Sequence, residues 1–224
     1  MKKYIAVALL ICGFASVKAQ TTRDVGTFHS VEVTDKIQVE LIHSSKAKVE
    51  IEGENNEHVD VVNKNGYLRL KMNTLNMLKG DLVSIKVYYT DINELSAKKG
   101  AKLVTNPEES LKMDVLKLSV GEGALATMNL AVQNLTLKAT AGAQVQLAGT
   151  ANRQDVILNL GASYNGKSLV TSLTNIALNG GGSASVHANG TVDAKTRGGG
   201  IIEVYGNPAA RTEKKFVGGE IIFK

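Results

Sequence analysis

Two short glycine-containing motifs in this chain have the residue types and spacing of known chemical sites. Residues 121–126, Gly-Glu-Gly-Ala-Leu-Ala, match the G-x-G-x-x-A pattern of dinucleotide-binding sites, but that pattern needs to open a helix. Residues 127–137 instead continue with the alternation of a strand. Residues 161–166 are similar to a nucleophile elbow around Ser163 but hold one residue too many for G-x-S-x-G. We therefore predict chain turns, not cofactor or nucleophile sites, at both places.

Acidic side chains in the second half are the next candidates, because polysaccharide lyases and hydrolases place carboxylates close together. They are Asp114, Glu122, Asp155, Asp193, Glu203, Glu213 and Glu220. Asp155 and Asp193 share an offset from a repeated glycine, but two repeats separate them. The histidines, His29, His43, His58 and His187, lack the spacing of metal ligands. We predict no catalytic, cofactor-binding or metal-binding residues, and the sequence indicates no particular ligand-binding residue.

The glycines belong to a repeat that occupies the last part of the chain. Its anchors are Gly100, Gly123, Gly142, Gly161, Gly181, Gly199 and Gly219, with gaps of 23, 19, 19, 20, 18 and 20 residues. Apolar residues alternate with polar ones on both sides of most anchors, as a half-buried strand does. A repeat near 20 residues without helical periodicity predicts a β-solenoid whose strands turn at small residues. The set Lys214, Phe216, Ile222 and Lys224 around Gly219 is expected to line the interior of the final coil.

The fold class predicted is all-β, a single-domain parallel β-helix or β-solenoid, with the right-handed sense usual for parallel connections. Residues 20–27 are expected to be a short tether, and residues 28–224 the solenoid domain. Within it, residues 28–94 hold strand-like runs without the glycine period and are expected to form opening coils or a cap. Asn65-Gly66 predicts a hairpin turn between two of these runs. Residues 95–224 form the regular coils.

The first 19 residues have the composition of a signal peptide, with Lys2 and Lys3 before an apolar run and Val17-Lys18-Ala19 as a cleavage site. Export to the periplasm, cell surface or exterior is therefore expected. Cys12, the chain's one cysteine, lies in the apolar run behind Ile11, which is an unsuitable neighbour for lipidation. Removing the leader's three lysines lowers the net charge from +5 to +2. That charge gives no reason to expect a nucleic-acid partner, and no later stretch is apolar enough to span a membrane.

Nearly the whole chain after the leader resembles a known family, the auto-transporter adhesin head domain or GIN domain of exported Bacteroidetes-type proteins. The resemblance rests on residues 25–33 as a first strand, residues 66–70 as a hairpin, residues 83–87 with the glycine corners as the body, and Tyr205-Gly206-Asn207-Pro208 near the end. Corners in that family often have the sequence Gly-Ser-Gly, whereas four corners here begin Gly-Ala. The resemblance implies a β-helix, an exported location and an adhesive role, and it brings no catalytic residues.

We therefore expect a non-enzymatic exported solenoid that acts as an adhesin or cell-envelope surface-binding protein. Its partner would be a glycan or another cell-surface polymer. Two alternatives remain from the sequence. One is a structural module that polymerises end to end or edge to edge, because the apolar residues Phe216, Ile222 and Phe223 could pair with another copy. The other is a β-helix polysaccharide lyase or hydrolase.

Overall fold

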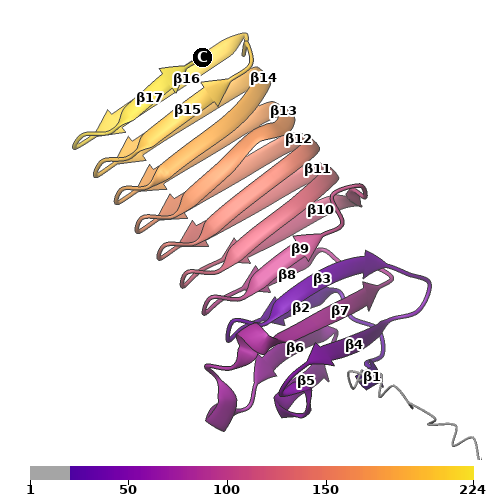
Figure 1. Ribbon diagram of the computed structural model, residues 1–224. Helices are drawn as coiled ribbons and strands as arrows, with labels where there is room; N and C mark the ends of the chain where they lie inside the picture. Colours follow the sequence, from indigo (N-terminus) through magenta and orange to yellow (C-terminus); the bar gives the residue numbers. More distant parts are fainter. Residues whose placement is uncertain (1–20) are drawn as a thin grey trace, which may run out of the picture.

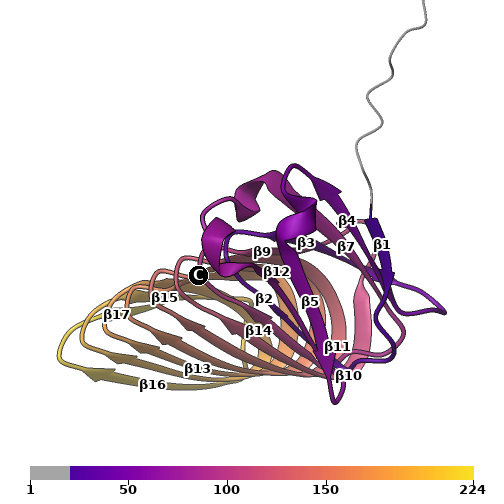
Figure 2. The same cartoon turned by 90° about the horizontal axis from the view of Figure 1, so that it is seen from below.

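The computed structural model describes residues 21–224, which form a rod of stacked β-coils (Figure 1). The expected signal peptide, residues 1–19, and Cys12 within it lie outside the described residues. The fold is an all-β solenoid of about 7 turns in a single domain, as the glycine repeat predicted. Viewed from below, the coils lie one behind another, with the N-terminal strands gathered at one end (Figure 2).

Residues 21–224 form seventeen strands and three short 3-10 helices. The opening strands are β1 (Thr21–Asp24), β2 (Ser30–Val33), β3 (Gln38–His43), β4 (Lys48–Gly53), β5 (Val59–Lys64), β6 (Tyr67–Met72) and β7 (Val83–Tyr89). The 3-10 helices are η1 (Asn56–His58), η2 (Thr74–Asn76) and η3 (Gly80–Leu82). The later strands are β8 (Glu94–Ala97), β9 (Lys102–Thr105), β10 (Leu111–Val120), β11 (Leu125–Thr140), β12 (Gln144–Asn159), β13 (Ser163–Asn179), β14 (Ser183–Arg197), β15 (Ile201–Tyr205), β16 (Ala210–Phe216) and β17 (Glu220–Phe223).

Each regular coil has two layers joined by a tight corner. We call the strand segments that lead into a corner the pre-corner layer: β6, β2, β8, β10, the second halves of β11 to β14, and β16. The segments that leave a corner form the post-corner layer: β7, β3, β9, the first halves of β11 to β14, β15 and β17. Neighbouring coils pair in parallel, as Leu125 with Gln144 and Thr140 with Asn159 between β11 and β12. Equivalent residues therefore form rows along the rod.

The corners have a common backbone conformation. Two consecutive residues adopt positive φ at Lys99-Gly100, Glu122-Gly123, Ala141-Gly142 and Leu160-Gly161. The second of these positions is glycine at all four corners, because glycine adopts this conformation without a Cβ clash. At Gly142 and Gly161 a Cβ would meet no atom within 4 Å, so the backbone angle and not the available space requires glycine there.

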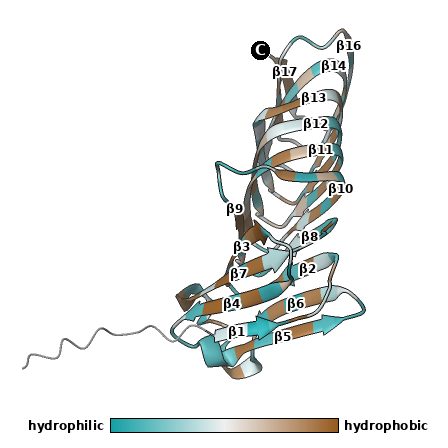
Figure 3. Ribbon diagram, turned by 90° about the vertical axis from the view of Figure 1, so that its right-hand side faces the viewer, coloured by the Kyte–Doolittle hydropathy of each residue, from teal (hydrophilic) through white to brown (hydrophobic). Residues whose placement is uncertain are grey.

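Apolar side chains from both layers fill the interior, as the alternation predicted. Leu118, Leu137, Leu158 and Leu178 are at most 1% exposed. Figure 3 shows hydrophobic residues recurring from coil to coil along the rod. Burying this continuous apolar surface is the main force that stabilises the stack.

A buried polar network interrupts the apolar interior near β13. The Tyr164 hydroxyl donates to Gln154 Oε1 at 2.9 Å, and the Gln154 amide donates to Thr174 Oγ1 at 3.0 Å. A Cβ on Gly166 would lie only 2.4 Å from the Tyr164 hydroxyl. Gly166 therefore leaves the space that the tyrosine ring occupies, and burial raises the pKa of Tyr164.

The predicted interior set of the final coil is wrong by one residue. The last positive-φ pair is Val217-Gly218, so Gly218 and not Gly219 occupies the anchor position. Pairing of Glu220 with Ile201 fixes this register. The sequence could not distinguish the two adjacent glycines. As a consequence Phe216 is 49% exposed, and the inward positions are Glu213, Lys215, Ile221 and Phe223.

Residues 28–94, expected to be opening coils or a cap, hold a further coil and antiparallel strands. Strands β2 and β3 form a complete coil whose corner, Asp35-Lys36, has positive φ at both residues but no glycine. This coil is inserted between later ones: β2 pairs in parallel with β6 and β8, and β3 with β7 and β9. The predicted Asn65-Gly66 turn joins antiparallel strands β5 and β6.

Residues 21–24 fall within the range 20–27 that was expected from the sequence to be a short tether. They form β1, which pairs antiparallel with β4 from Thr21–Ile51 to Asp24–Lys48. The Arg23 side chain also donates to the Val59 carbonyl at 3.2 Å. Antiparallel strands β1, β4 and β5 thus close the N-terminal end of the rod, where an open coil would expose its interior.

Candidate functional site

The residues that sequence patterns raised as catalytic candidates lie apart from one another. Residues 121–126 form a corner that leads directly into the strand β11. Ser163 starts β13, and its hydroxyl is 3.2 Å from that of Ser183. Residues 121–126 do not open a helix, so the geometry does not favour a nucleotide site there. Among the described residues, no general base is bonded to Ser163, so the geometry does not favour an activated serine.

The acidic residues of the coils pair with neighbouring cations along their own strands. Asp155 receives hydrogen bonds of 2.8 and 3.0 Å from Arg153, and Lys195 lies 2.8 Å from Asp193. The row order places Asn175 between the two aspartates, on the intervening coil. Arg153 holds the pKa of Asp155 below its usual value. This pairing keeps Asp155 ionised, and the site lacks the raised pKa of a general acid.

The other acids and the histidines are similarly dispersed. Glu203 contacts Lys224 and Tyr205, Glu213 contacts Lys215, and Asp114, Glu122 and Glu220 are exposed on separate elements. The histidines lie on different elements: His29 before β2, His43 in β3, His58 in η1 and His187 in β14. Among residues 21–224, no three His, Cys, Asp or Glu side chains are grouped as metal ligands.

The outer surface of the post-corner layer has an uncharged central region. Across β11 to β14 two adjacent rows carry only hydroxyl and amide side chains, apart from Leu125 at one end of a row. We call these residues the neutral ladder: Thr127, Gln144, Gln146, Ser163, Asn165, Ser183 and Ser185. A shallow hollow of about 180 Å³ adjoins it, lined in part by Thr127, Gln146 and Pro107.

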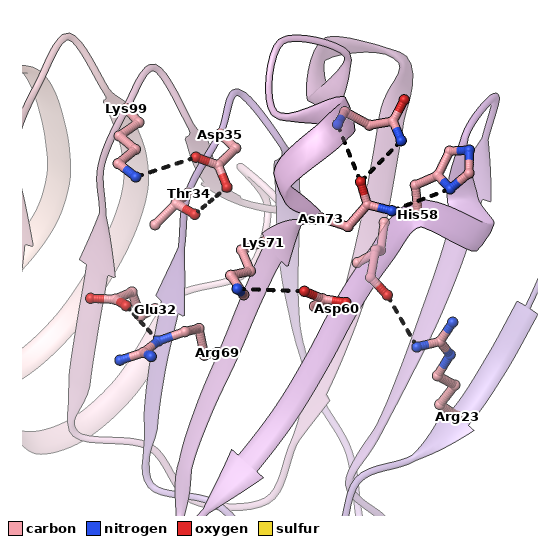
Figure 4. Close-up of polar contacts among 12 residues, drawn as sticks. Arg23, Glu32, Thr34, Asp35, His58, Asp60, Arg69, Lys71, Asn73 and Lys99 are labelled. Carbon is pink, nitrogen blue, oxygen red and sulfur yellow. Dashed lines mark hydrogen bonds and ion pairs between the residues drawn. The ribbon is translucent and has the colours of Figure 1, made fainter.

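The pre-corner layer is charged on its outer surface. Glu32 is central to it, with a side chain only 9% exposed and a contact of 2.9 Å to Arg69 (Figure 4). A second contact, of 2.7 Å, joins Glu32 to Lys98. Burial alone would raise the pKa of Glu32. Hydrogen bonds from Lys98 and Tyr67, with the charges of Lys98 and Arg69, outweigh it and hold that pKa below its usual value. Glu32 is therefore a fixed anion that orders the cations around it.

Beside this cluster lies a hollow of about 290 Å³, which we call the serine hollow. Its floor contains Ser96 and Ser119, which are paired neighbours on β8 and β10. Its rim includes Tyr67, Lys98 and Lys138. No sequence motif indicated this hollow, because its residues come from four strands, β6, β8, β10 and β11, and become neighbours only through the stacking of coils.

An apolar loop between β6 and β7 replaces the tight corner of its coil. Leu75 is 93% and Leu78 78% exposed. The loop is nevertheless ordered: the Asn73 side chain accepts from the backbone and side-chain N–H groups of Asn76 and lies 3.4 Å from His58 (Figure 4). No helix in the described part of the chain is long and apolar enough to cross a bilayer.

Residues 27–208 match the model of the family described as “Putative auto-transporter adhesin, head GIN domain”. The chain belongs to this family. The GIN-domain match covers the β2–β3 coil as well as the glycine corners up to Gly199, and it ends before the last corner at Val217-Gly218. No curated protein matches the sequence.

Solved structures similar to this GIN domain come from several bacteria. A “putative adhesin” from Bacteroides fragilis has a TM-score of 0.82 at 20% identity, with 92% of this chain and 97% of that chain covered. One from Parabacteroides merdae has a TM-score of 0.70 at 18% identity, covering 92% and 97%. A “putative lipid binding protein” from Parabacteroides distasonis has a TM-score of 0.71 at 13% identity, covering 93% and 98%. At these identities the likeness concerns the fold.

Proposed function

We propose that this GIN-domain protein is a non-enzymatic, exported adhesin that binds a neutral glycan of a cell envelope or surface through its neutral ladder. Membership of an adhesin family and the signal-peptide composition of residues 1–19 support export and surface binding. The observation that carries the choice of ligand is the absence of charge from the ladder residues across four coils.

The chemistry of the ladder suits a polymer rich in hydroxyl groups. Strands of adjacent coils lie about 4.8 Å apart, and alternate residues along a strand about 7 Å apart, so the amides and hydroxyls form a regular flat array. Each such group both donates and accepts hydrogen bonds, as sugar hydroxyls do. Individually these bonds are weak, but a polymer that meets several coils gains through multivalency.

The two alternatives raised by the sequence have less support. A lyase or hydrolase needs a carboxylate free to transfer a proton, whereas Asp155 and Asp193 are each bonded to a cation on their own strand. End-to-end polymerisation needs an apolar terminal coil, but charged Glu213 and Lys215 occupy two of its inward positions.

The test uses the described chain, residues 21–224, in sedimentation with insoluble neutral polysaccharides such as cellulose, mannan and β-glucan, beside acidic alginate. We expect binding to at least one neutral polymer and none to alginate. Introducing two charges with Gln146→Glu and Asn165→Asp should weaken that binding at least tenfold. Gln133→Glu is the matched control, because Gln133 is exposed outside the ladder. Absence of binding to every neutral polymer, or equal loss in the control, would contradict the proposal.

A further inference from the structure

The lining of the serine hollow includes three residues with short or no side chains, Ser96, Ser119 and Gly121. Ser96 and Ser119 face each other across β8 and β10, and Gly121 follows two residues after Ser119. Gly121 is outside the positive-φ residues, so its backbone does not require glycine. A Cβ there would lie 3.3 Å from the Thr140 methyl group. Long side chains such as Lys98 and Lys138 rise around this small-residue floor.

One floor atom has an unmet hydrogen-bonding requirement. Ser96 is 8% exposed, and its hydroxyl is buried without a partner among the described residues. Buried hydroxyls in native proteins nearly always bond to protein, water or ligand, because leaving one unpaired is costly. Ser96 lines the hollow, and a water molecule or a ligand hydroxyl that enters it would supply the missing partner.

The rim carries both signs of charge. Lys98 and Lys138 contribute ammonium groups, whereas Glu94 and Glu122 contribute carboxylates. Lys98 is held in place by its 2.7 Å contact with the buried Glu32. A charged ligand would therefore meet a like charge on one part of the rim. A neutral ligand with several hydroxyls can instead accept from the ammonium groups and donate to the carboxylates.

An aromatic ring completes the wall. Tyr67 lies on β6 beside the hollow, with the Arg69 guanidinium 5.6 Å from its ring centre. Aromatic rings give apolar contact area at low conformational cost, together with a polar hydroxyl. This combination of hydroxyls, paired charges and a tyrosine matches a ring that has both polar edges and C–H faces.

We propose that the serine hollow binds one neutral sugar ring, as a subsite separate from the neutral ladder. The inference rests on the proposal that the protein binds glycans, and it adds recognition of a single residue on the opposite layer. The ladder would hold the polymer through many weak contacts, and the hollow would select which sugar residue is present in a branch or chain end.

The test is an NMR titration of ¹⁵N-labelled protein with the methyl glycosides of glucose, galactose, mannose and N-acetylglucosamine. We expect at least one to shift the amide signals of Ser96, Ser119 and Gly121. Glucuronic acid and glucosamine, the charged counterparts, should bind at least tenfold more weakly. Shifts absent from the hollow with all four glycosides, or equal affinity for the charged sugars, would overturn the proposal.

Two variants separate binding from folding. Ser119→Phe, at an exposed strand position that tolerates aromatic residues, should fill the hollow and abolish the shifts. Ser168→Phe, at an exposed position of β13 outside both the hollow and the neutral ladder, is its matched control and should leave them unchanged. Ser96→Ala should weaken binding at least threefold while the ligand-free protein keeps or raises its melting temperature, since an unpaired hydroxyl is removed. A lower melting temperature with unchanged affinity would show a purely structural serine.

The outcome is distinguishable from that of the polymer experiment. Sedimentation with a neutral polysaccharide and no shifts in the hollow would remove the subsite and leave the adhesin proposal intact. Shifts in the hollow without polymer binding would remove the ladder proposal and leave the subsite.

Discussion

At the scale of single residues, Glu32 shows how a buried charge is stabilised on an outward-facing row. Its carboxylate is almost covered, yet it is bonded to Lys98 and Arg69, whose own side chains are about half exposed. Removing a carboxylate that receives charge-assisted hydrogen bonds costs about 1.5–3 kcal/mol. The partially solvated cations would recover some of this through water, so the lower part of that range applies here.

This arrangement predicts a pH dependence of stability. The pKa of Glu32 is lower in the folded state than in the unfolded chain. Its contribution is therefore complete above the unfolded value and is lost as the pH falls through and below it. We expect Glu32→Gln to lower the free energy of unfolding by about 1.5 kcal/mol at pH 7. Between pH 7 and pH 3 the variant should lose less of its free energy of unfolding than the native chain does.

Urea unfolding at both pH values measures this effect. Glu108→Gln in an exposed loop is the control and should behave as the native chain does. Identical acid sensitivity of the Glu32→Gln and native chains would contradict the assignment, because Glu32 would then contribute nothing that titrates.

The residue scale also shows the limit of prediction from sequence. The alternation placed Tyr164 and Gly166 correctly on the interior, because burial follows the period of two. It could not show that the tyrosine ring occupies the space above Gly166, or that Gln154 from the preceding coil receives its hydroxyl. Those contacts join different coils. The serine hollow was missed for the same reason.

At the scale of elements, the corner is a two-residue unit and not a single glycine. The sequence revealed the second residue of each pair by its identity. The first residue of each pair has no sequence signal. Its identity varies among Lys99, Glu122, Ala141 and Leu160, and these residue types are common in every kind of secondary structure. For this reason the Asp35-Lys36 corner, which has no glycine, and the coil that it creates could not be placed from the period alone.

Val217 is the most strained of these first positions. Its φ is 55°, a left-handed conformation in which a β-branched residue is an outlier, and its side chain is 88% exposed. The left-handed conformation costs about 1–2 kcal/mol for an ordinary residue, whereas asparagine tolerates it. We expect Val217→Asn to raise stability by about 1 kcal/mol, equivalent to a melting temperature about 2–4 °C higher.

Val115 supplies the matched control, since it is an exposed valine on the extended strand β10. Val115→Asn should lower the melting temperature, because asparagine is disfavoured in strands. If both substitutions destabilise the protein, the strain attributed to the Val217 backbone is absent in solution.

At the scale of the whole molecule, a solenoid must keep its two ends from pairing with other copies. The two ends, which lie at opposite extremes of the rod, are protected from such pairing in different ways (Figure 1). At the N-terminal end, β4 pairs antiparallel with β7 and β5 pairs antiparallel with β6. Strand β1 in turn pairs antiparallel with β4. At the C-terminal end β16 and β17 are unpaired on their outer edges within the described chain, so side chains have to prevent association.

The side chains of β16 are suited to that purpose. Pairing with β14 places Arg211, Glu213 and Lys215 in the same rows as three residues that are at most 1% exposed: Val192, Ala194 and Thr196. Charged groups thus occupy these three inward rows of β16, where the next coil would need apolar contact. The Arg211 guanidinium lies 4.6 Å from the Phe223 ring centre and covers the aromatic residue at the open end. Inward-pointing charges are a known means of preventing edge-to-edge aggregation.

We therefore expect the native chain to remain monomeric and the triple variant Arg211→Val, Glu213→Val and Lys215→Val to associate through its C-terminal end. Valine favours strands, so the variant keeps the propensity of β16 while it exposes an apolar row. Light scattering after size-exclusion chromatography measures the mass over a wide concentration range. The control, Thr212→Val with Lys214→Val, adds valine to the outward rows of the same strand and should stay monomeric. Linear oligomers of the native chain would contradict this prediction and would support the alternative function of a polymerising structural module. In that case the apolar contact between ends would outweigh the cost of desolvating three charges.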